Sequence, residues 1–268
     1  MTRVRVIYII PSAAVPWAGA KDRAMEVLED LQWFFADEMA RLGYGQRTFD
    51  IARELDGSLL FHQINSPLGR EQFIQADRRQ YPSRCRSAAK KHGLCDDSNL
   101  TIYFVEAYSI IDGQVRVNCS GWPRNGGEAF LSSLYLKMAL RDWLADSTPY
   151  AGMRFEWIDP EPLAGSLRKW NNRGTTLGDL SGAAYGVIAH ELAHGFPPAR
   201  EEKKGGRNGP LMGRGHLGMR GYFRPDLTDD RCWLRPEDGQ ALDSNQRLTI
   251  MELKPKSSAF GTTTRRSS

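Results

Sequence analysis

The sequence has few of the residues that would define a disulfide scaffold or a membrane protein. It contains four cysteines among 268 residues (Cys85, Cys95, Cys119 and Cys232) and no C-x-x-C pair. This number excludes a disulfide-rich scaffold and leaves open a single bridge between Cys85 and Cys95. No segment approaches the run of about eighteen apolar residues that a transmembrane helix needs. We therefore expect no membrane partner.

An excess of charge of one sign is also missing. The 36 basic side chains are nearly balanced by 32 acidic ones, for a net charge of +4. Residues 254–268 carry four of the basic side chains and no acidic one, so the rest of the chain is close to neutral. A neutral body excludes the basic footprint of a nucleic-acid-binding protein. The composition predicts one catalytic domain over residues 1–253 and a disordered basic tail over 254–268.

The first twenty residues have the early arginines and small residues of a secretion signal, but the apolar core is short. The uninterrupted apolar run, Val6–Ile10, ends at Pro11, whereas a signal peptide uses about seven or more such residues. We interpret residues 4–10 as a buried strand instead. The compartment stays open between a secreted or periplasmic protein whose leader has been removed and a cytoplasmic one, and the oligomeric state is not predicted.

Apolar periodicity predicts an α/β (α+β) fold in the remainder of the chain. Apolar residues between Met25 and Leu42 recur every three or four positions and stop at Gly43, as in a long amphipathic helix. Residues 48–64 and 100–120 each contain two apolar runs joined by Asp-Gly, a hairpin signal. Residues 67–92 and 131–146 have helical patterns, and the glycine-rich residues 121–130 suit a loop or a bulged edge strand. The expected architecture is a twisted mixed sheet with a long N-terminal helix and an active-site helix.

The active-site helix is predicted from the segment AHELAHGF. His190 and His194 are four residues apart and Glu191 follows the first of them, which is the H-E-x-x-H pattern. On a helix this spacing projects both imidazoles from one face, where they can bind one metal ion. Glu191 would then be the general base that takes a proton from water activated by zinc.

The residues before the motif favour such a helix. Capping candidates precede an unbroken run that ends at Pro197: Thr175, Thr176, Asp179 and Ser181. A bulky stripe falls on one side of the helix: Tyr185, Ile188, Leu192 and Phe196. The histidines fall on the opposite side beside small residues such as Gly186, which predicts that they face a cleft.

The motif and the segment that follows it resemble the metzincin clan of zinc peptidases. In that clan the zinc helix is followed by a tight turn that carries a methionine beneath the metal, and Met212 in GPLMG matches that methionine. The detailed match covers residues 180–225, and the order of the earlier elements is also similar. The resemblance implies a zinc-dependent endopeptidase with a peptide or protein substrate.

The sequence departs from the clan at the third zinc ligand. The clan places a glycine and a third ligand at the seventh and tenth positions after the first histidine, where this chain has Pro197 and Arg200. Arginine cannot coordinate zinc, whereas imidazole and carboxylate can. We rank His216 first as the third ligand, with Glu201 or Glu202 next. The remaining histidines, His62 in a predicted strand and His92 in a lysine-rich stretch, are interpreted as structural or surface residues.

The sequence thus predicts a zinc metallopeptidase with His190, His194 and His216 on the metal and Glu191 as the base. Two alternatives stay open: a degenerate metzincin-like binding protein without full zinc coordination, and a zinc hydrolase of non-peptide amides. Tyr222 is a candidate for stabilising the oxyanion. Residues 125–128 are a candidate edge strand that could pair with an extended peptide.

Overall fold

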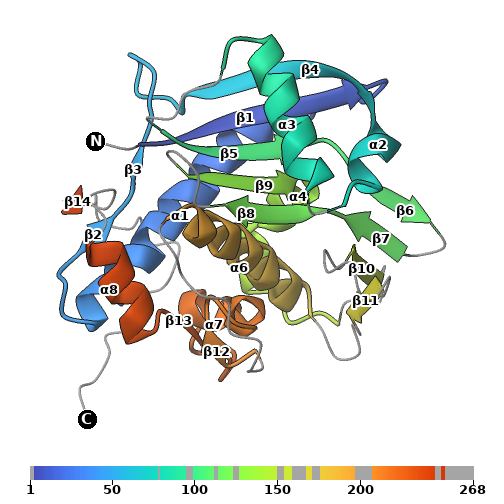
Figure 1. The fold of residues 1–268 in the computed structure, drawn as a ribbon. Helices are drawn as coiled ribbons and strands as arrows, with labels where there is room; N and C mark the ends of the chain where they lie inside the picture. The colour runs from blue at the N-terminus through green and yellow to red at the C-terminus, as the bar shows by residue number, and fades with distance from the viewer. Residues whose placement is uncertain are drawn as a thin grey trace.

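Six strands form the main sheet of the molecule (Figure 1). The computed structural model describes residues 3–77, 79–94, 99–111, 114–122, 127–149, 154–158, 167–170, 176–196, 207–244 and 249–250. β1 (Arg3–Ser12) lies inside the sheet, with β5 (Leu100–Val105) on one side and β3 (Asp50–Ile51) and β4 (Phe61–Gly69) on the other. β9 (Glu128–Ser132) continues the parallel order beyond β5. β8 (Cys119–Trp122) pairs antiparallel with β9 and ends the sheet.

The sheet is covered on both faces. α1 (Ala20–Arg41), α4 (Leu134–Met138) and α6 (Leu177–Gly195) share one core with the side chains that point to their face. α2 (Arg70–Ile74) and α3 (Gln80–Lys91) share a second core on the opposite face. In Figure 1 α3 lies in front of the parallel strands and α1 behind them.

The apolar run Val6–Ile10 lies in β1, and the burial of this strand explains why the run is unbroken. Val6 and Tyr8 belong to the core under α1 and α6, whereas Ile7 and Ile9 belong to the core under α3. A parallel strand with both faces buried needs apolar residues at every position. The run Val6–Ile10 is therefore a buried strand, as predicted, and the predicted long helix is α1.

Three smaller sheets and four further short helices complete the described chain. β6 (Ser109–Ile111), β7 (Gln114–Val117), β10 (Arg154–Ile158) and β11 (Leu167–Trp170) form one sheet. β12 (Gly209–Pro210) pairs with β13 (Cys232–Trp233), and β2 (Arg47–Thr48) pairs with β14 (Thr249–Ile250). The short helices are α5 (Arg141–Leu144), the 3₁₀ helix η1 (Gly215–Gly218), α7 (Arg220–Phe223) and α8 (Pro236–Ser244).

The predicted α/β class is confirmed, and the first predicted hairpin is present but shorter than predicted. A tight turn does form at Gly57, closed by the amide of Gly57 on the carbonyl of Glu54. An antiparallel bridge between Arg53 and Leu59 joins its arms, with backbone hydrogen bonds from Glu54 to Ser58 and from Leu60 to Ala52, both at 2.8 Å. Beyond this short hairpin β3 and β4 both pair with β1 in parallel rather than with each other. At the second Asp-Gly, residues 112–113 lie outside the described chain, and β6 and β7 on either side of them pair antiparallel as predicted.

Other predictions about the chain are met in part or lie beyond the described residues. The helical pattern of 67–92 corresponds to α2 and α3, whereas 131–146 is divided between the end of β9, α4 and α5. Cys85 is a buried free thiol, and Cys95 lies outside the described part, as do residues 254–268. The single domain over 1–253 stays a prediction.

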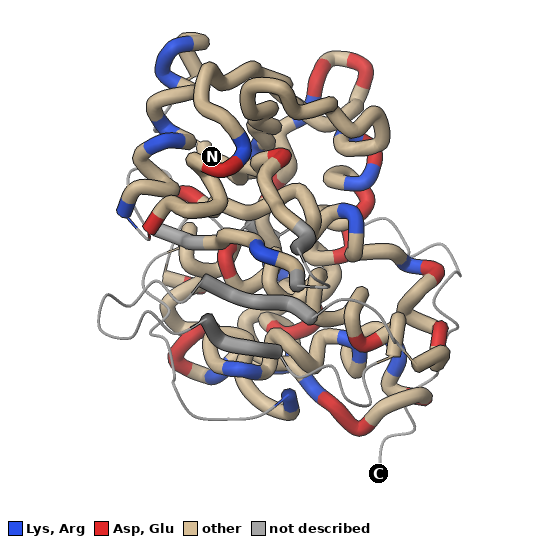
Figure 2. The backbone as a smooth tube through the Cα atoms, turned by 90° about the vertical axis from the view of Figure 1, so that its right-hand side faces the viewer, with Lys and Arg blue, Asp and Glu red and all other residues tan. Residues whose placement is uncertain are grey.

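The described chain has neither a long run of charges of one sign (Figure 2) nor a long apolar helix. Basic and acidic residues are interspersed along the backbone in Figure 2. Among the helices that the structure describes, none combines the length and the apolar character that crossing a bilayer would require.

Candidate metal-binding and active site

α6, which carries the H-E-x-x-H motif, begins at the predicted cap. The amide of Asp179 donates to Oγ1 of Thr176 at 3.1 Å, and the amide of Thr176 donates to Oδ2 of Asp179 at 2.9 Å. This reciprocal capping box satisfies two of the amides that a helix start leaves unpaired. The helix then runs to Gly195 without a break. The bulky stripe is buried as predicted, and it packs against α1 as well as the sheet, because Tyr185 donates a hydrogen bond to Asp30 and Phe196 contacts Phe35.

One face of α6 carries a glycine or a histidine at every fourth position, from Gly178 through Gly182 and Gly186 to His190 and His194. The three glycines let the segment after the motif approach the helix backbone. A Cβ at Gly186 would lie 1.7 Å from the carbonyl oxygen of His216, and one at Gly182 would lie 2.6 Å from the backbone nitrogen of Arg220. η1 and α7 therefore cover the face beside Gly186, which was predicted to line the cleft in front of the histidines, whereas His190 and His194 themselves are half-buried.

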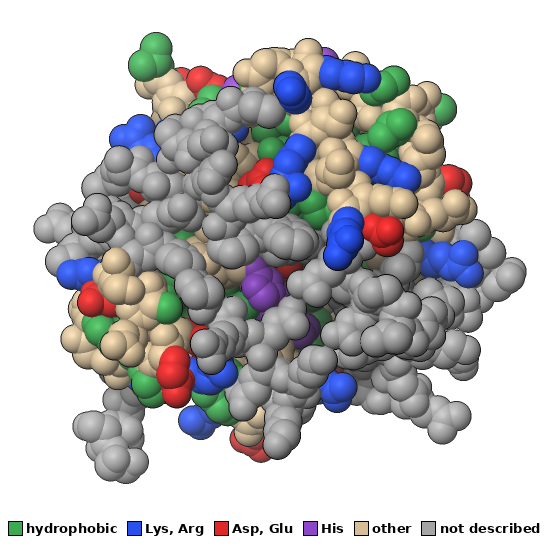
Figure 3. Space-filling view, viewed as in Figure 1, with side chains coloured by type: hydrophobic (Ala, Val, Ile, Leu, Met, Phe, Trp, Pro, Cys, Tyr) green, Lys and Arg blue, Asp and Glu red, His purple; other side chains and the backbone are tan. Residues whose placement is uncertain are grey.

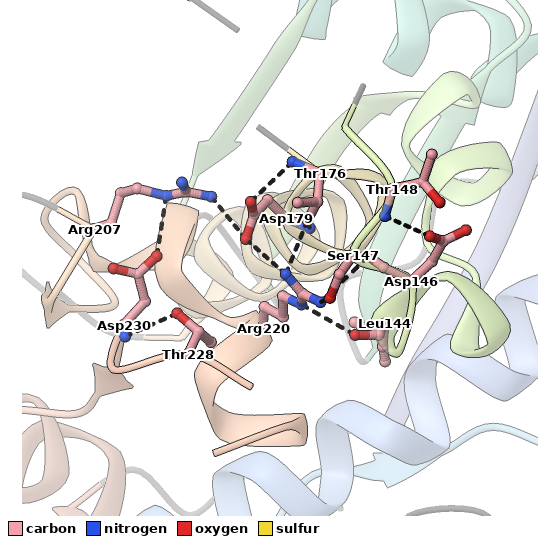
Figure 4. Close-up of polar contacts among 10 residues, drawn as sticks. All are labelled: Leu144, Asp146, Ser147, Thr148, Thr176, Asp179, Arg207, Arg220, Thr228 and Asp230. Atoms are coloured by element: carbon pink, nitrogen blue, oxygen red, sulfur yellow. Dashed lines mark hydrogen bonds and ion pairs between the residues drawn. The ribbon is translucent and has the colours of Figure 1, made fainter. Parts of the chain in front are cut away.

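Arg220 connects the segment that contains η1 and α7 to the start of α6 through hydrogen bonds (Figure 4). Its guanidinium donates to Oγ1 of Thr176 at 2.8 Å, to Oδ1 of Asp179 at 3.3 Å and to the carbonyl of Leu144 at 3.0 Å. The residue is 3% exposed. A buried guanidinium is stable only when its donors are satisfied, which these partners achieve.

Arg207 continues the same network toward β13. It forms ion pairs with Asp179 at 3.4 Å and with Asp230 at 3.2 Å (Figure 4). Burial acts to raise the pKa of the Asp179 carboxyl, but the hydrogen bonds from Thr176 and the charges of Arg207 and Arg220 outweigh it, so the pKa is lowered. Asp179 is therefore held as a carboxylate that joins the helix cap to the segment after the motif.

The two motif histidines face one another. Nε2 of His190 lies 3.1 Å from Nε2 of His194, and the ring centroids are 4.7 Å apart. Nδ1 of His190 donates to the carbonyl of Leu211 at 2.8 Å. A neutral His190 therefore carries its lone pair on Nε2, the atom that faces His194. Figure 3 shows histidine side chains at the surface of the face that carries α6.

This pair fits two ligands of a zinc ion. Two nitrogens bound at about 2.0–2.1 Å to one tetrahedral zinc lie about 3.3 Å apart, close to the observed separation. A backbone carbonyl on the outer nitrogen is also the usual partner of a zinc-bound histidine, because it fixes the tautomer and the ring orientation. Within the described residues, no group of three or more potential ligands surrounds one point. The third ligand is therefore unassigned.

His216, the predicted third ligand, lies next to the pair. Its ring centroid is 4.9 Å from that of His190, and its Nδ1 donates to the carbonyl of Gly213 at 2.7 Å. Burial and the nearby His190 lower the pKa of His216 to about 3, so its ring is neutral. Its role as a ligand stays a prediction. Glu201 and Glu202, the alternatives, lie outside the described residues, as do Pro197 and Arg200.

The methionine-bearing turn lies beside His190. The amide of Gly213 donates to the carbonyl of Pro210 at 2.9 Å, which closes a tight turn over Pro210–Gly213. Met212 within it is 1% exposed. The preceding residue, Leu211, supplies the carbonyl that holds His190. The turn that the resemblance implied is therefore present and contacts a motif histidine.

Glu191 is 7% exposed and lies on the sheet side of the helix, near β8 and α4. Burial raises the pKa of the Cys119 thiol of β8 well above its usual range, and the charge of Glu191 and a hydrogen bond with it act in the same direction. In the sequence Cys119 is only one of four cysteines outside any C-x-x-C pair. No pattern in the sequence connects it with the motif, because the contact depends on the register of β8.

The other predicted site residues are placed elsewhere or only partly described. The hydroxyl of Tyr222 donates to Asp37 of α1 at 2.7 Å, so it is engaged away from the histidine pair. Glu128 begins β9 and pairs with Arg86 at 2.7 Å, and residues 123–126 lie outside the described chain. β8, just before the predicted segment, forms one edge of the main sheet. His62 lies in β4 as predicted, and His92 is exposed with Nε2 3.1 Å from the carbonyl of Asn65.

The chain is similar in fold to solved structures of another protein. No protein-family model matches the sequence, and no curated protein matches it. Three crystal structures of OgpA from Akkermansia muciniphila are similar, each covering 93% of this chain and 62% of the OgpA chain. A catalytically inactive form in complex with an O-glycopeptide substrate, glycodrosocin, gives a TM-score of 0.54 at 18% identity. Two crystal forms of the wild type give 0.55 at 18% and 0.53 at 19%. The chain, which spans less than two thirds of OgpA, is therefore similar to it in fold.

Proposed function

We propose that this protein is a zinc-dependent metallopeptidase that hydrolyses peptide bonds, with an endopeptidase action on a peptide or protein substrate. The observation that carries the proposal is the arrangement of His190 and His194, whose Nε2 atoms lie 3.1 Å apart while the outer nitrogen of His190 is held by a carbonyl. Zinc-binding histidines regularly use such an outer hydrogen bond, which fixes the tautomer and the ring orientation.

Each motif residue has a distinct part in the proposed reaction. His190 and His194 would hold zinc, with His216, Glu201 or Glu202 as the third ligand. When bound, zinc supplies Lewis-acid polarisation of water and of the scissile carbonyl. Glu191 accepts a proton from the attacking water and passes it to the leaving amine, a role worth about 10²- to 10⁴-fold in rate.

The fold similarity supports a peptide substrate. OgpA was crystallised with an O-glycopeptide substrate, and this chain has a similar fold over 93% of its length. The edge strand β8 also offers backbone groups that an extended peptide could pair with. These points favour a peptide over a non-peptide amide as the substrate.

The test combines metal content with hydrolysis. After dialysis against metal-free buffer the wild type should retain about one zinc ion per chain and should cleave glycodrosocin or the same peptide without its glycan. Glu191→Gln should keep the zinc and lose hydrolysis. His92→Ala, which changes a surface histidine, is the control and should keep both. Hydrolysis that survives Glu191→Gln would refute the assignment of the base.

The second candidate is a binding protein that keeps the fold without full zinc coordination. Its support is Arg200, which occupies the position where the metzincin pattern has the third ligand. A wild-type protein that retains no zinc and cleaves neither peptide would favour this candidate. Comparison of zinc affinity among His216→Ala, Glu201→Ala and Glu202→Ala identifies the third ligand, because the affected variant should lose affinity by orders of magnitude.

A further inference from the structure

The thiol of Cys119 lies beside the carboxylate that the proposed function uses as its base. In the antiparallel pair of β8 and β9, Cys119 is opposite Leu131. Residues directly opposite one another in such a pair point to the same face of the sheet. Leu131 belongs to the core under α6, whereas its neighbour Phe130 belongs to the core under α3. Cys119 therefore points toward α6, against whose core it packs.

Glu191 meets this thiol from the helix. α6 lies against β8, and Glu191 is 7% exposed. The charge of Glu191 and a hydrogen bond with it both contribute to the raised pKa of the Cys119 thiol, so the two side chains are in contact and the sulfur is protonated. A carboxylate has only acceptor atoms, so the thiol is the donor. Tyr135 of α4, which is 1% exposed, interacts with the same thiol.

We propose that Cys119 is a positioning residue for Glu191: its S–H group donates to one carboxylate oxygen and leaves the other free to accept a proton. This inference rests on the proposed function. A glutamate has three rotatable side-chain bonds, and a carboxylate without a fixed partner would be distributed over several rotamers. A thiol is a weak donor, so it can orient the carboxylate without the strong pairing that an arginine would impose.

The first test measures the contact without relying on activity or metal. The native protein is treated with iodoacetamide at about pH 8, near the ordinary thiol pKa of about 8.5, and modification of Cys119 is followed by peptide mass spectrometry. Glu191→Gln keeps the shape and removes the charge, so Cys119 should react about tenfold faster, as for a thiol pKa lower by one unit. Glu29→Gln, which changes a half-exposed residue of α1, is the matched control. Cys232, a buried thiol in β13, is the internal reference and should react at an unchanged rate.

Equal rates at Cys119 in the wild type and in Glu191→Gln would overturn the proposal. If the thiol reacts in neither protein, its S–H stretching band in the Raman difference spectrum between wild type and Cys119→Ala decides. The contact is supported if the wild-type band lies at the frequency of a hydrogen-bonded thiol and moves in Glu191→Gln. A wild-type band at the free-thiol frequency overturns the proposal.

The second test concerns the positioning itself. Cys119→Ala should lower kcat about tenfold, the equivalent of one modest hydrogen bond, with KM and zinc content unchanged. Cys119→Ser, which keeps a donor, should recover most of the loss. If Cys119 is alkylated faster in Glu191→Gln but the wild type cleaves no peptide, the proposed function is refuted while the contact between Cys119 and Glu191 is supported. Hydrolysis that depends on Glu191 but is unaffected by Cys119→Ala would refute the positioning role and keep the function.

Discussion

Nε2 of His190 and Nε2 of His194 lie 3.1 Å apart on adjacent turns of α6, and Nδ1 of His190 is bonded to the carbonyl of Leu211. The carbonyl removes Nδ1 from competition for a metal and directs the lone pair of Nε2 toward its neighbour. Two neutral rings with both lone pairs directed inward would repel each other. A shared cation or a shared proton relieves that repulsion, and the proposed zinc ion is such a cation.

The first prediction concerns metal affinity. His190→Ala and His194→Ala should each weaken binding of Zn²⁺ by at least about 100-fold, because each removes one direct ligand and even an outer-shell partner is worth about 10- to 100-fold. Isothermal titration calorimetry with zinc, or titration followed by Co²⁺ absorption, measures the change. His62→Ala in β4 is the matched control. If both histidine variants bound zinc as tightly as the wild type does, the metal would lie elsewhere.

The second prediction concerns the close approach at Gly186. Gly186→Ala would put a methyl group 1.7 Å from the carbonyl oxygen of His216, so η1 must move or the helix must bend. We expect a loss of about 1–3 kcal/mol or more in the free energy of unfolding, the usual cost of overpacking. Urea denaturation measures it. The control is Gly69→Ala, where the nearest atom to the new methyl is the Gln72 side chain at 3.9 Å.

The third prediction concerns the buried guanidinium of Arg220. Arg220→Met leaves the carboxylate of Asp179 and the carbonyl of Leu144 without this donor. Removing one partner of a buried ion pair costs about 3–5 kcal/mol, and we expect a loss in that range from denaturant unfolding. Arg224→Met is the control, because Arg224 pairs at the surface with an exposed aspartate, Asp226. Such exposed pairs contribute about 0–1 kcal/mol. Equal losses in the two variants would contradict the role given to Arg220.

The fourth prediction concerns stability at acid pH. The folded-state pKa of Asp179 is lowered, so its ionised form stabilises the fold above the unfolded-state value of about 3.9. This stabilisation is lost as the pH falls through the lower folded-state pKa. Asp179→Asn should therefore be less stable than the wild type at pH 7, and the difference should narrow as the pH falls below about 4.

The control for that measurement is Asp226→Asn. The pKa of this exposed carboxylate is also lowered, chiefly by a side-chain hydrogen bond from Arg224, but solvent screens the pair. Urea unfolding at a series of pH values should show the pH-dependent difference for Asp179→Asn and a much smaller one for Asp226→Asn. A difference for Asp179→Asn that stays constant down to the lowest pH would contradict the assignment.

The sequence predicted those features that depend on neighbours along the chain. The cap at Thr176 and Asp179, the length of α6 and the buried stripe are local patterns, and each is present. The Asp-Gly at residues 56–57 correctly indicated a turn with antiparallel arms, but not how short they are, because the parallel pairing of β3 and β4 with β1 is a tertiary preference. The pairing partner of a strand is not encoded in its own residues.

Within the site, what sequence analysis missed depends on contacts between distant segments. The spacing of Gly178, Gly182 and Gly186 was a readable signal, since it repeats every fourth residue in line with the histidines. It shows that a backbone approaches the helix, but it does not identify that backbone as η1 and α7. Arg220 and Cys119 had no comparable signal, because their partners are 41 and 72 positions away.

The final prediction tests the catalytic part that sequence analysis gave to Tyr222. Its hydroxyl donates to Asp37 at 2.7 Å and its ring packs edge-on against Phe34 with centroids 5.0 Å apart. A hydroxyl engaged with a carboxylate on α1 is not directed to a developing oxyanion at the histidine pair. Tyr222→Phe should therefore keep kcat within about twofold of the wild type while it lowers the free energy of unfolding by about 1–3 kcal/mol, because the variant removes a donor to a carboxylate. Steady-state hydrolysis and urea unfolding measured on the same preparation separate the two effects. A fall in kcat of about 100-fold or more is the loss typical of an oxyanion donor. It would show that Tyr222 takes part in the reaction and that its hydrogen bond to Asp37 breaks when substrate binds.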